Sequence, residues 1–159
     1  MDDAKQIINR LDLSPHPEGG YYRETYKSEQ QVSLLKGKRR FAGTAIYFML
    51  TEGELSNWHR VRWDELWHFY AGGQLVLEVI DKSGGLNKLK LSNDLKDDVE
   101  FQQLVPQHCW QRAYSSGDYS LVGCTVSPGF EFEDFEMIEP EQLAKTYPHI
   151  RDQILTNPV

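Results

Sequence analysis

The pattern of hydrophobic and polar positions divides the chain into three parts. Apolar side chains recur at a helical spacing in residues 3–13, which predicts a short amphipathic helix. Pro15 and Pro17 then prevent that helix from continuing. The helical spacing returns near the end of the chain, in residues 139–157. We therefore expect a short helical segment at each end, and a different structure in the middle, over about residues 17–138.

The middle of the chain consists of short apolar runs separated by glycine and proline turns. Many short strands at this spacing are typical of an all-β sandwich or barrel. An aromatic-rich run at residues 21–26 adds a strand ahead of them. The other expected strands are 44–50, 57–61, 65–70, 74–80, 86–91, 101–105, 110–114 and 119–127. Because no repeat or linker interrupts this series, we expect a single domain over residues 1–159.

Composition and charge limit the kind of protein. Hydrophobic residues make up 40% of the chain and aromatic residues 12%, which is enough for a core without disulfide or metal staples. The net charge of −7 argues against a nucleic-acid partner. No apolar run is long enough to span a membrane, and the N-terminus lacks the pattern of a signal peptide. We therefore expect a cytoplasmic protein in which Cys109 and Cys124 are reduced and buried.

Two charged segments are interpreted as surface features. The positive charges between Lys36 and Arg40 could bind an anion, but a solvated loop is the simpler interpretation. Asp134 and Glu136 lie among aromatic residues near the C-terminal end. For these two acids, a contact at a strand edge or in a dimer fits better than a chemical role.

The candidate chemistry lies between residues 53 and 72. His59 is expected on a strand, with Asn57 and Val61 on the same face. Glu65 opens the next strand, and a hairpin would bring its carboxylate within reach of the His59 imidazole. Such a pair is either half of a metal site or an acid/base pair. A satisfied core histidine is the alternative for His59, whereas a carboxylate inside a barrel needs a partner or a ligand.

Further candidate residues surround this pair. Trp67 and Phe69 share a strand face with the carboxylate and are expected to form the cavity wall. Tyr22 and Tyr47 are candidate hydroxyl donors at the mouth of the cavity. An inward Arg23 would bind a carboxylate or phosphate group of a ligand, and an ion pair with a surface acid is the open alternative.

Four residues match the first signature of the cupin superfamily in type and spacing: Gly53, His59, Glu65 and Gly72. The second histidine position of that signature holds Val61, and Gln111 takes the place of the histidine in the second signature. Cupins hold a divalent metal with three histidines and one glutamate at these positions. The resemblance therefore leaves two strong donors here, and we expect no cofactor. If a metal binds, its ligands would be His59, Glu65 and Gln111.

Three longer segments make the resemblance more specific. Residues 16–24, 65–70 and 121–136 look like segments of the cupin-5 family, whose members are small and largely uncharacterised. The resemblance covers roughly residues 5–140. It implies a double-stranded β-helix (jelly roll), usually a homodimer, with a ligand-sized cavity inside the barrel. Structural relatives include the deoxysugar-nucleotide epimerases of rhamnose synthesis.

The leading functional hypothesis is a protein that binds a small polar metabolite in its barrel. The metabolite would be sugar-like or a sugar nucleotide, and His59 and Glu65 would epimerise or isomerise it by proton transfer. A metal-dependent cupin enzyme, such as a dioxygenase using Gln111 as a further ligand, is one alternative; the missing second histidine argues against it. A non-catalytic sensor or storage protein is the other. We also expect a homodimer, because Tyr21, Tyr22 and Tyr26 would otherwise expose an aromatic edge strand.

Overall fold

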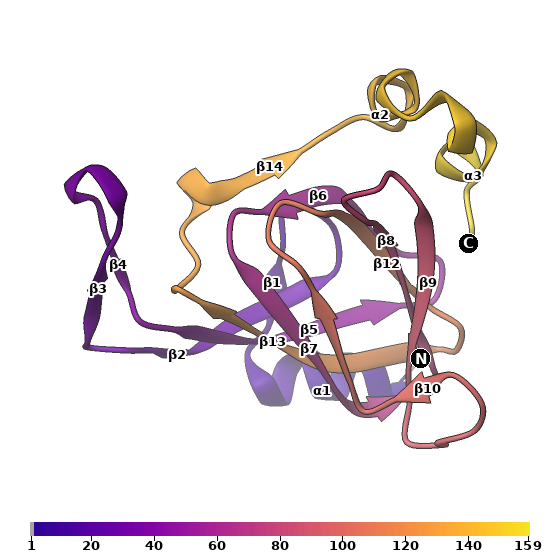
Figure 1. The fold of residues 1–159 in the computed structure, drawn as a ribbon. Coiled ribbons are helices and arrows are strands. Elements are labelled where there is room, and N and C mark those ends of the chain that lie inside the picture. Colours follow the sequence, from indigo (N-terminus) through magenta and orange to yellow (C-terminus); the bar gives the residue numbers. More distant parts are fainter. Residues whose placement is uncertain (1) are drawn as a thin grey trace.

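The computed structural model describes residues 2–159 and contains two six-stranded sheets that form a barrel (Figure 1). The first sheet contains, in hydrogen-bonded order, β1 (Ser14–Pro15), β2 (Tyr21–Lys27), β5 (Thr44–Thr51), β13 (Tyr119–Ser127), β7 (Asp64–Gly72) and β11 (Gln102–Val105). The second contains β10 (Val99–Glu100), β9 (Leu86–Leu91), β8 (Leu75–Ile80), β12 (Trp110–Ser115), β6 (Leu55–Val61) and β14 (Phe135–Met137). The fold is the all-β jelly roll that the strand pattern and the resemblance predict.

The expected strands agree closely with the observed ones. Each run predicted between residues 44 and 127 forms a strand whose ends differ from the prediction by no more than two residues. The residue pattern identifies these strands because side chains alternate between the two faces of a sheet. The short strands β1, β10 and β14 carry too few residues to show such a pattern, and they were not predicted.

The pairing of β6 with β7 was predicted wrongly. The two strands are consecutive in the chain, but they do not form a hairpin. β6 pairs with β12 and β14 in the second sheet, whereas β7 pairs with β13 and β11 in the first. Residues of β6 and β7 therefore meet across the interior of the barrel and not side by side within one sheet.

Helices cover the outer faces of both sheets (Figure 1). α1 (Asp2–Leu11) packs through Ala4 against Met49 of the first sheet. At the other end of the chain, α2 (Pro140–Thr146), the 3-10 turn η3 (Pro148–Ile150) and α3 (Arg151–Leu155) pack around Trp58 and Trp110 of the second sheet. The helical segments predicted at both ends are thus confirmed. No helix within residues 2–159 has the length and hydropathy needed to cross a membrane.

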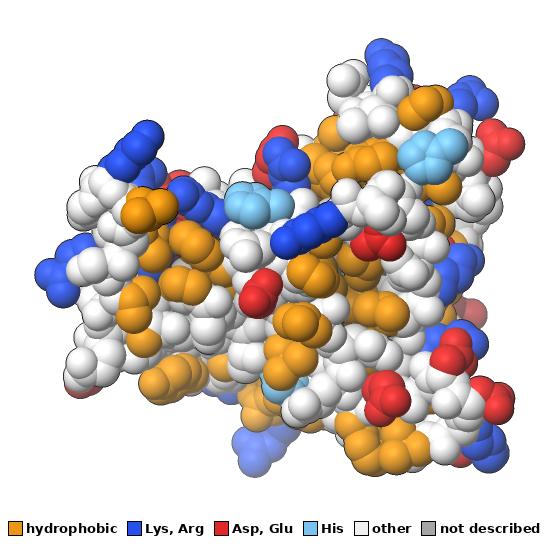
Figure 2. Space-filling model, viewed as in Figure 1, with side chains coloured by type: hydrophobic (Ala, Val, Ile, Leu, Met, Phe, Trp, Pro, Cys, Tyr) orange, Lys and Arg blue, Asp and Glu red, His pale blue; other side chains and the backbone are white. Residues whose placement is uncertain are grey.

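A hairpin arm projects from the barrel between β2 and β5 (Figure 1). It consists of β3 (Gln31–Ser33), the 3-10 turn η1 (Leu35–Gly37) and β4 (Arg39–Phe41). Figure 2 shows hydrophobic side chains gathered between the arm and the barrel.

The interpretation of the basic cluster as a solvated loop is wrong for Arg40, which is buried in this arm. The Arg40 Nε donates to Asp134 at 2.8 Å, and its guanidinium also pairs with Glu133. Both acids belong to the segment around η2 (Phe132–Asp134), so their charges attach the arm to that segment. This pairing joins residues 94 positions apart, which no local pattern reveals.

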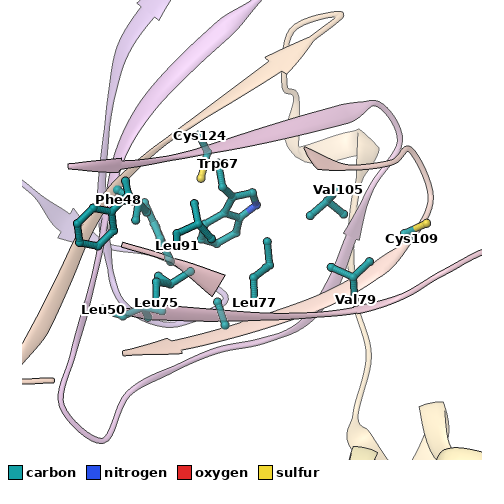
Figure 3. Packing of buried hydrophobic residues seen from close by; sticks show 13 residues of the cluster. Phe48, Leu50, Trp67, Leu75, Leu77, Val79, Leu91, Val105, Cys109 and Cys124 are labelled. Carbon is teal, nitrogen blue, oxygen red and sulfur yellow. The ribbon is translucent and has the colours of Figure 1, made fainter. Parts of the chain in front are cut away.

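Apolar side chains fill one end of the barrel interior. Figure 3 shows the Trp67 ring at its centre, with Leu77 and Leu91 close to the ring. Every residue of β8 is buried, because one face of the strand lies in this core and the C-terminal helices cover the other. Burying a large apolar side chain contributes about 1.5–3 kcal/mol, so this packed end of the barrel contributes strongly to stability. The other end is hollow.

Candidate functional site

The hollow end of the barrel forms a cavity of about 270 Å³. Its lining comes from both sheets, from the loop before β2 and from the segment that follows β13. Among the lining side chains are the predicted site residues Tyr22, His59, Glu65 and Trp67. The cavity therefore brings together four of the eight residues that the sequence analysis singled out.

The alternation of side chains along β2 and β7 decides which residues reach the cavity. On β7, Glu65 and Trp67 both point inward. On β2, Tyr22 and Glu24 line the cavity, and Arg23 between them is therefore exposed on the outer face. Its guanidinium lies 5.8 Å from the ring centre of Tyr47. The inward orientation considered for Arg23 is thus wrong.

Two other predicted lining residues lie outside the cavity. Tyr47 alternates with the lining residue Ile46, so its ring faces outward and packs with the α1 side of the first sheet. Phe69 has the inward orientation expected for it, but it lies two residues further along β7 than Trp67 and belongs to the packed core. Neither side chain can contact a ligand in this cavity without a rearrangement of the barrel.

A β-bulge in β6 sets the orientation of His59. Gln111 pairs with His59 and Ala113 pairs with Ser56, so β6 contains one residue more than β12 between these pairs. The extra residue places both Ser56 and His59 in the interior, where they are buried. Asn57, which was expected to share the face of His59, is exposed instead.

The loop between β1 and β2 contributes two residues that sequence reasoning missed as site residues. The Glu18 Oε2 lies 3.2 Å from the His59 Nε2, and the Ser56 hydroxyl donates to the Glu18 Oε1 at 2.9 Å. His16 also lines the cavity, and its Nδ1 accepts a hydrogen bond from the Glu18 backbone N–H at 3.1 Å. The turn depends on Gly19, which has a φ of 109°. A Cβ there would lie 2.0 Å from the Leu55 carbonyl oxygen.

The tautomer of His59 follows from its two contacts. Its Nδ1 lies 2.7 Å from the Asn57 carbonyl oxygen, which can only accept, so Nδ1 carries the proton. In the neutral ring, Nε2 then presents a lone pair to Glu18. Burial raises the pKa of Glu18 from its usual 4.5 to about 8, and burial lowers the pKa of His59. At neutral pH the proton therefore resides on Glu18, whose O–H donates to the His59 Nε2.

Glu65 is held by neutral donors. Its Oε1 accepts hydrogen bonds from the Gln111 Nε2 at 2.8 Å and from the Trp67 Nε1 at 3.1 Å. Burial raises the pKa of Glu65, although the nearby His59 and the two hydrogen bonds lower it. Gln111, predicted as a ligand-binding residue, is not part of the cavity lining: its amide supports Glu65 from behind.

Two of the four cupin ligand positions carry a strong metal donor in this chain, His59 and Glu65. Val61 lines the cavity at one of the cupin ligand positions but has no donor atom. The Gln111 side chain donates to Glu65 and accepts from Trp67, so its oxygen is already engaged. Within residues 2–159 no three His, Cys, Asp or Glu side chains are grouped as metal ligands. Stable metal sites in proteins usually supply three or four ligands.

The two-sheet barrel with a cavity at one end defines a cupin. Oxalate decarboxylase from Bacillus subtilis has the same fold: it superposes with a TM-score of 0.57 at 15% identity, over 92% of this chain and 37% of that chain. At this identity the likeness concerns the fold alone. One structure of that enzyme comes from a study of its Mn(II) centres.

This chain belongs to the family described as "Cupin superfamily (DUF985)", whose model matches residues 5–138. A hypothetical protein from Leishmania major is 35% identical with a TM-score of 0.88, over 95% of this chain and 96% of that one. A protein from Shewanella oneidensis is 40% identical with a TM-score of 0.86, over 98% of each chain. An uncharacterised protein of Saccharomyces cerevisiae is 25% identical over 157 residues, covering 89% of this chain and 78% of that protein.

Proposed function

We propose that this cupin binds a small sugar-like metabolite in its cavity and isomerises or epimerises it by proton transfer, without a resident metal. The observation that carries the proposal is the 3.2 Å contact between the Glu18 Oε2 and the His59 Nε2. The contact lies in a cavity that Glu65 also lines. Buried acids and bases with shifted pKa values are typical of sites that move protons.

The Glu18–His59 pair can act as one acid/base unit. Transfer of the Glu18 proton to the His59 Nε2 leaves a carboxylate and an imidazolium in the cavity. The carboxylate removes a proton from a ligand carbon next to a carbonyl group, and the imidazolium returns a proton to the ligand. Each turnover then leaves the pair with one proton, as at the start. Burial raises the pKa of Glu65, which favours the protonated form that can donate a hydrogen bond to the ligand oxygen on which charge develops.

Isotope exchange tests this proposal. Native mass spectrometry of the purified protein identifies a co-purified ligand, which is then incubated with the protein in D2O. We expect deuterium to enter a C–H bond of the ligand, as followed by NMR. Glu65→Gln should slow the exchange by about 100-fold or more, because the substitution removes the acidic proton. The control is Glu136→Gln, an exposed acid that pairs with Arg60 outside the cavity, and it should exchange at the wild-type rate.

Two results would contradict this function. A ligand that binds but never exchanges a proton would identify a non-catalytic binding protein. One equivalent of iron, zinc, manganese or nickel per chain, required for turnover, would identify a metal-dependent cupin enzyme.

We also propose that the protein is a homodimer. Tyr26 on β2 is 58% exposed, and Leu35 at the tip of the arm is 91% exposed. A second copy that covers this side would bury both apolar groups. Sedimentation should give twice the 18.5 kDa mass of the chain at micromolar concentration, and a particle of 18.5 kDa would overturn the proposal.

A further inference from the structure

The charged groups around the cavity are all acids or imidazoles. No lysine or arginine is among its described lining residues, whereas Glu18, Glu24 and Glu65 are. Carboxylate and phosphate groups of ligands are usually held by arginine or lysine side chains. The described lining residues therefore provide no lysine or arginine to bind an anionic ligand.

Two cations next to this end of the barrel already have partners. Arg40 pairs with Asp134 and Glu133. The Lys27 Nζ lies 3.9 Å from the Glu24 Oε1 and stacks over the Phe41 ring. Recruiting either charge for a ligand would break contacts that the protein already makes.

Burial disfavours charge on the polar groups of the interior. Burial raises the pKa of Glu18 to about 8 and also raises the pKa of Glu65, while burial lowers the pKa of His16 to about 4. Protonated carboxyls and neutral imidazoles can both donate and accept hydrogen bonds, which suits hydroxyl groups. An anion placed here would meet these groups without a compensating positive charge.

Three phenylalanines also line the cavity. Phe130, Phe132 and Phe135 pack edge to face with ring centres 5.1–6.0 Å apart, and the Phe135 ring lies 5.5 Å from the His59 ring. A sugar ring matches such a site because its C–H face packs on aromatic rings while its hydroxyls reach polar groups. The 270 Å³ volume lies just below the about 300–1,000 Å³ typical of drug-sized ligands, so a single sugar ring fits it more closely than a sugar nucleotide does.

We infer that the cavity selects an uncharged polyhydroxy ligand, a free sugar or polyol, over its phosphorylated, carboxylated or nucleotide-linked counterparts. The inference rests on the proposed function, because it names the substrate class of the same site. It also narrows the choice that the sequence left open between a sugar-like ligand and a sugar nucleotide.

Matched ligand pairs test the inference. Saturation-transfer NMR compares a panel of neutral aldoses and ketoses with counterparts that carry a phosphate, a carboxylate or a UDP group. We expect the neutral member of a pair to bind at least tenfold more tightly. Glu24→Lys places a cation at the exposed mouth of the cavity and should reduce that ratio at least threefold. Glu29→Lys, an equal charge change at an exposed position outside the cavity, should leave the ratio unchanged.

The outcomes separate this inference from the proposed function. Equal or tighter binding of the phosphorylated or nucleotide-linked members would overturn the inference, while deuterium exchange into those ligands would keep the proposed function. Binding of no sugar of either kind would overturn both. An unchanged ratio in Glu24→Lys would show that charge at the cavity does not determine selection, and this too would overturn the inference.

Discussion

Two regions of the molecule contain buried glutamates, but the partners of these glutamates differ. They are cations in one region and neutral groups in the other. Behind β8, Glu78 is 2% exposed and pairs with Arg112 and Lys88. In the cavity, Glu18 and Glu65 are 6% and 7% exposed, and their hydrogen bonds come from neutral hydroxyl, amide and indole groups. A buried carboxylate is costly unless a cation compensates it. The cavity accepts that cost, and burial raises the pKa of both carboxyls as a result.

Glu78 also helps to hold the C-terminal helix α3 on the second sheet. Arg112 pairs with Glu78, donates to the carbonyl oxygens of Gln153 and Ile154, and stacks over the Trp58 ring at 4.7 Å. The charge of Glu78 is therefore part of the packing between α3 and the second sheet. The two regions show that burial alone does not distinguish the two kinds of glutamate, whereas the presence or lack of a cationic partner does.

Substituting glutamine for a buried glutamate in each region is the strongest test of this difference. Glu78→Gln leaves Arg112 without its buried partner and should lower the free energy of unfolding by about 3–5 kcal/mol. Glu65→Gln keeps the hydrogen bonds from Gln111 and Trp67, so the free energy of unfolding should change by about 1–2 kcal/mol at most, or increase. Urea unfolding of both variants measures the difference. Equal losses would show that Glu65 is also a structural ion-pair partner.

The pH dependence of stability sharpens the comparison. The pKa of Glu18 is raised in the folded protein, so its contribution is fully present below pH 4.5 and is lost as the pH rises toward 8. The pKa of His16 is lowered from 6.5 to about 4, so stability is lost as the pH falls through that interval. Stability should therefore be greatest between about pH 5 and 6.5 and decline toward pH 8 by a few kcal/mol.

Glu18→Gln isolates the alkaline part of this profile. The variant has no carboxyl to titrate at this position, so its free energy of unfolding should decline less between pH 5 and 8 than that of the wild type. Chemical unfolding at a series of pH values measures both profiles. Identical slopes for the two proteins would contradict the raised pKa of Glu18.

Ligand binding provides a smaller effect. Glu65→Gln should weaken the binding of a hydroxyl-rich ligand by about 1–2 kcal/mol, because an amide replaces the hydrogen bond of the carboxyl group with a weaker one. Calorimetric titration with the co-purified ligand measures it. Unchanged affinity in a folded Glu65→Gln protein would remove this carboxyl from the binding site.

The smallest expected effect is at Arg23. Its side chain lies on the outer face over Tyr47, so Arg23→Gln should change both stability and ligand affinity by less than about 0.5 kcal/mol. The same titration measures the affinity. A large loss of binding would mean that the arginine reaches the ligand after all.

Much of the fold could be predicted from the sequence because strand periodicity is a local property. The same alternation correctly placed Glu65 and Trp67 in the interior, since they lie on a regular strand. It failed for Asn57, because the bulge in β6 shifts the alternation by one residue. It also could not assign β6 and β7 to separate sheets, since sheet membership depends on contacts distant in the chain.

The missed part of the site lies outside the regular strands. Glu18 sits in a loop, where no periodicity indicates the direction of a side chain. The signal was the segment from His16 to Gly20, in which two charged or titratable residues precede a glycine pair. Both glycines have positive φ values, 109° and 72°, so the turn that aims Glu18 at His59 is specified by residue type. A glycine pair beside a histidine and an acid was the available clue.

Asp134 connects three segments that are far apart in the sequence. Its carboxylate accepts hydrogen bonds from the Arg40 Nε in the arm at 2.8 Å and from the Trp63 Nε1 before β7 at 3.0 Å. Phe132 and Phe135 lie on either side of it in the chain and line the cavity, so the hydrogen bonds to Asp134 help to hold this wall in place. The consequence is kinetic. For a ligand of the proposed kind, we expect Asp134 to affect how quickly it enters and leaves and the interior carboxyls to affect how tightly it is held, so residence time and affinity would depend on different residues.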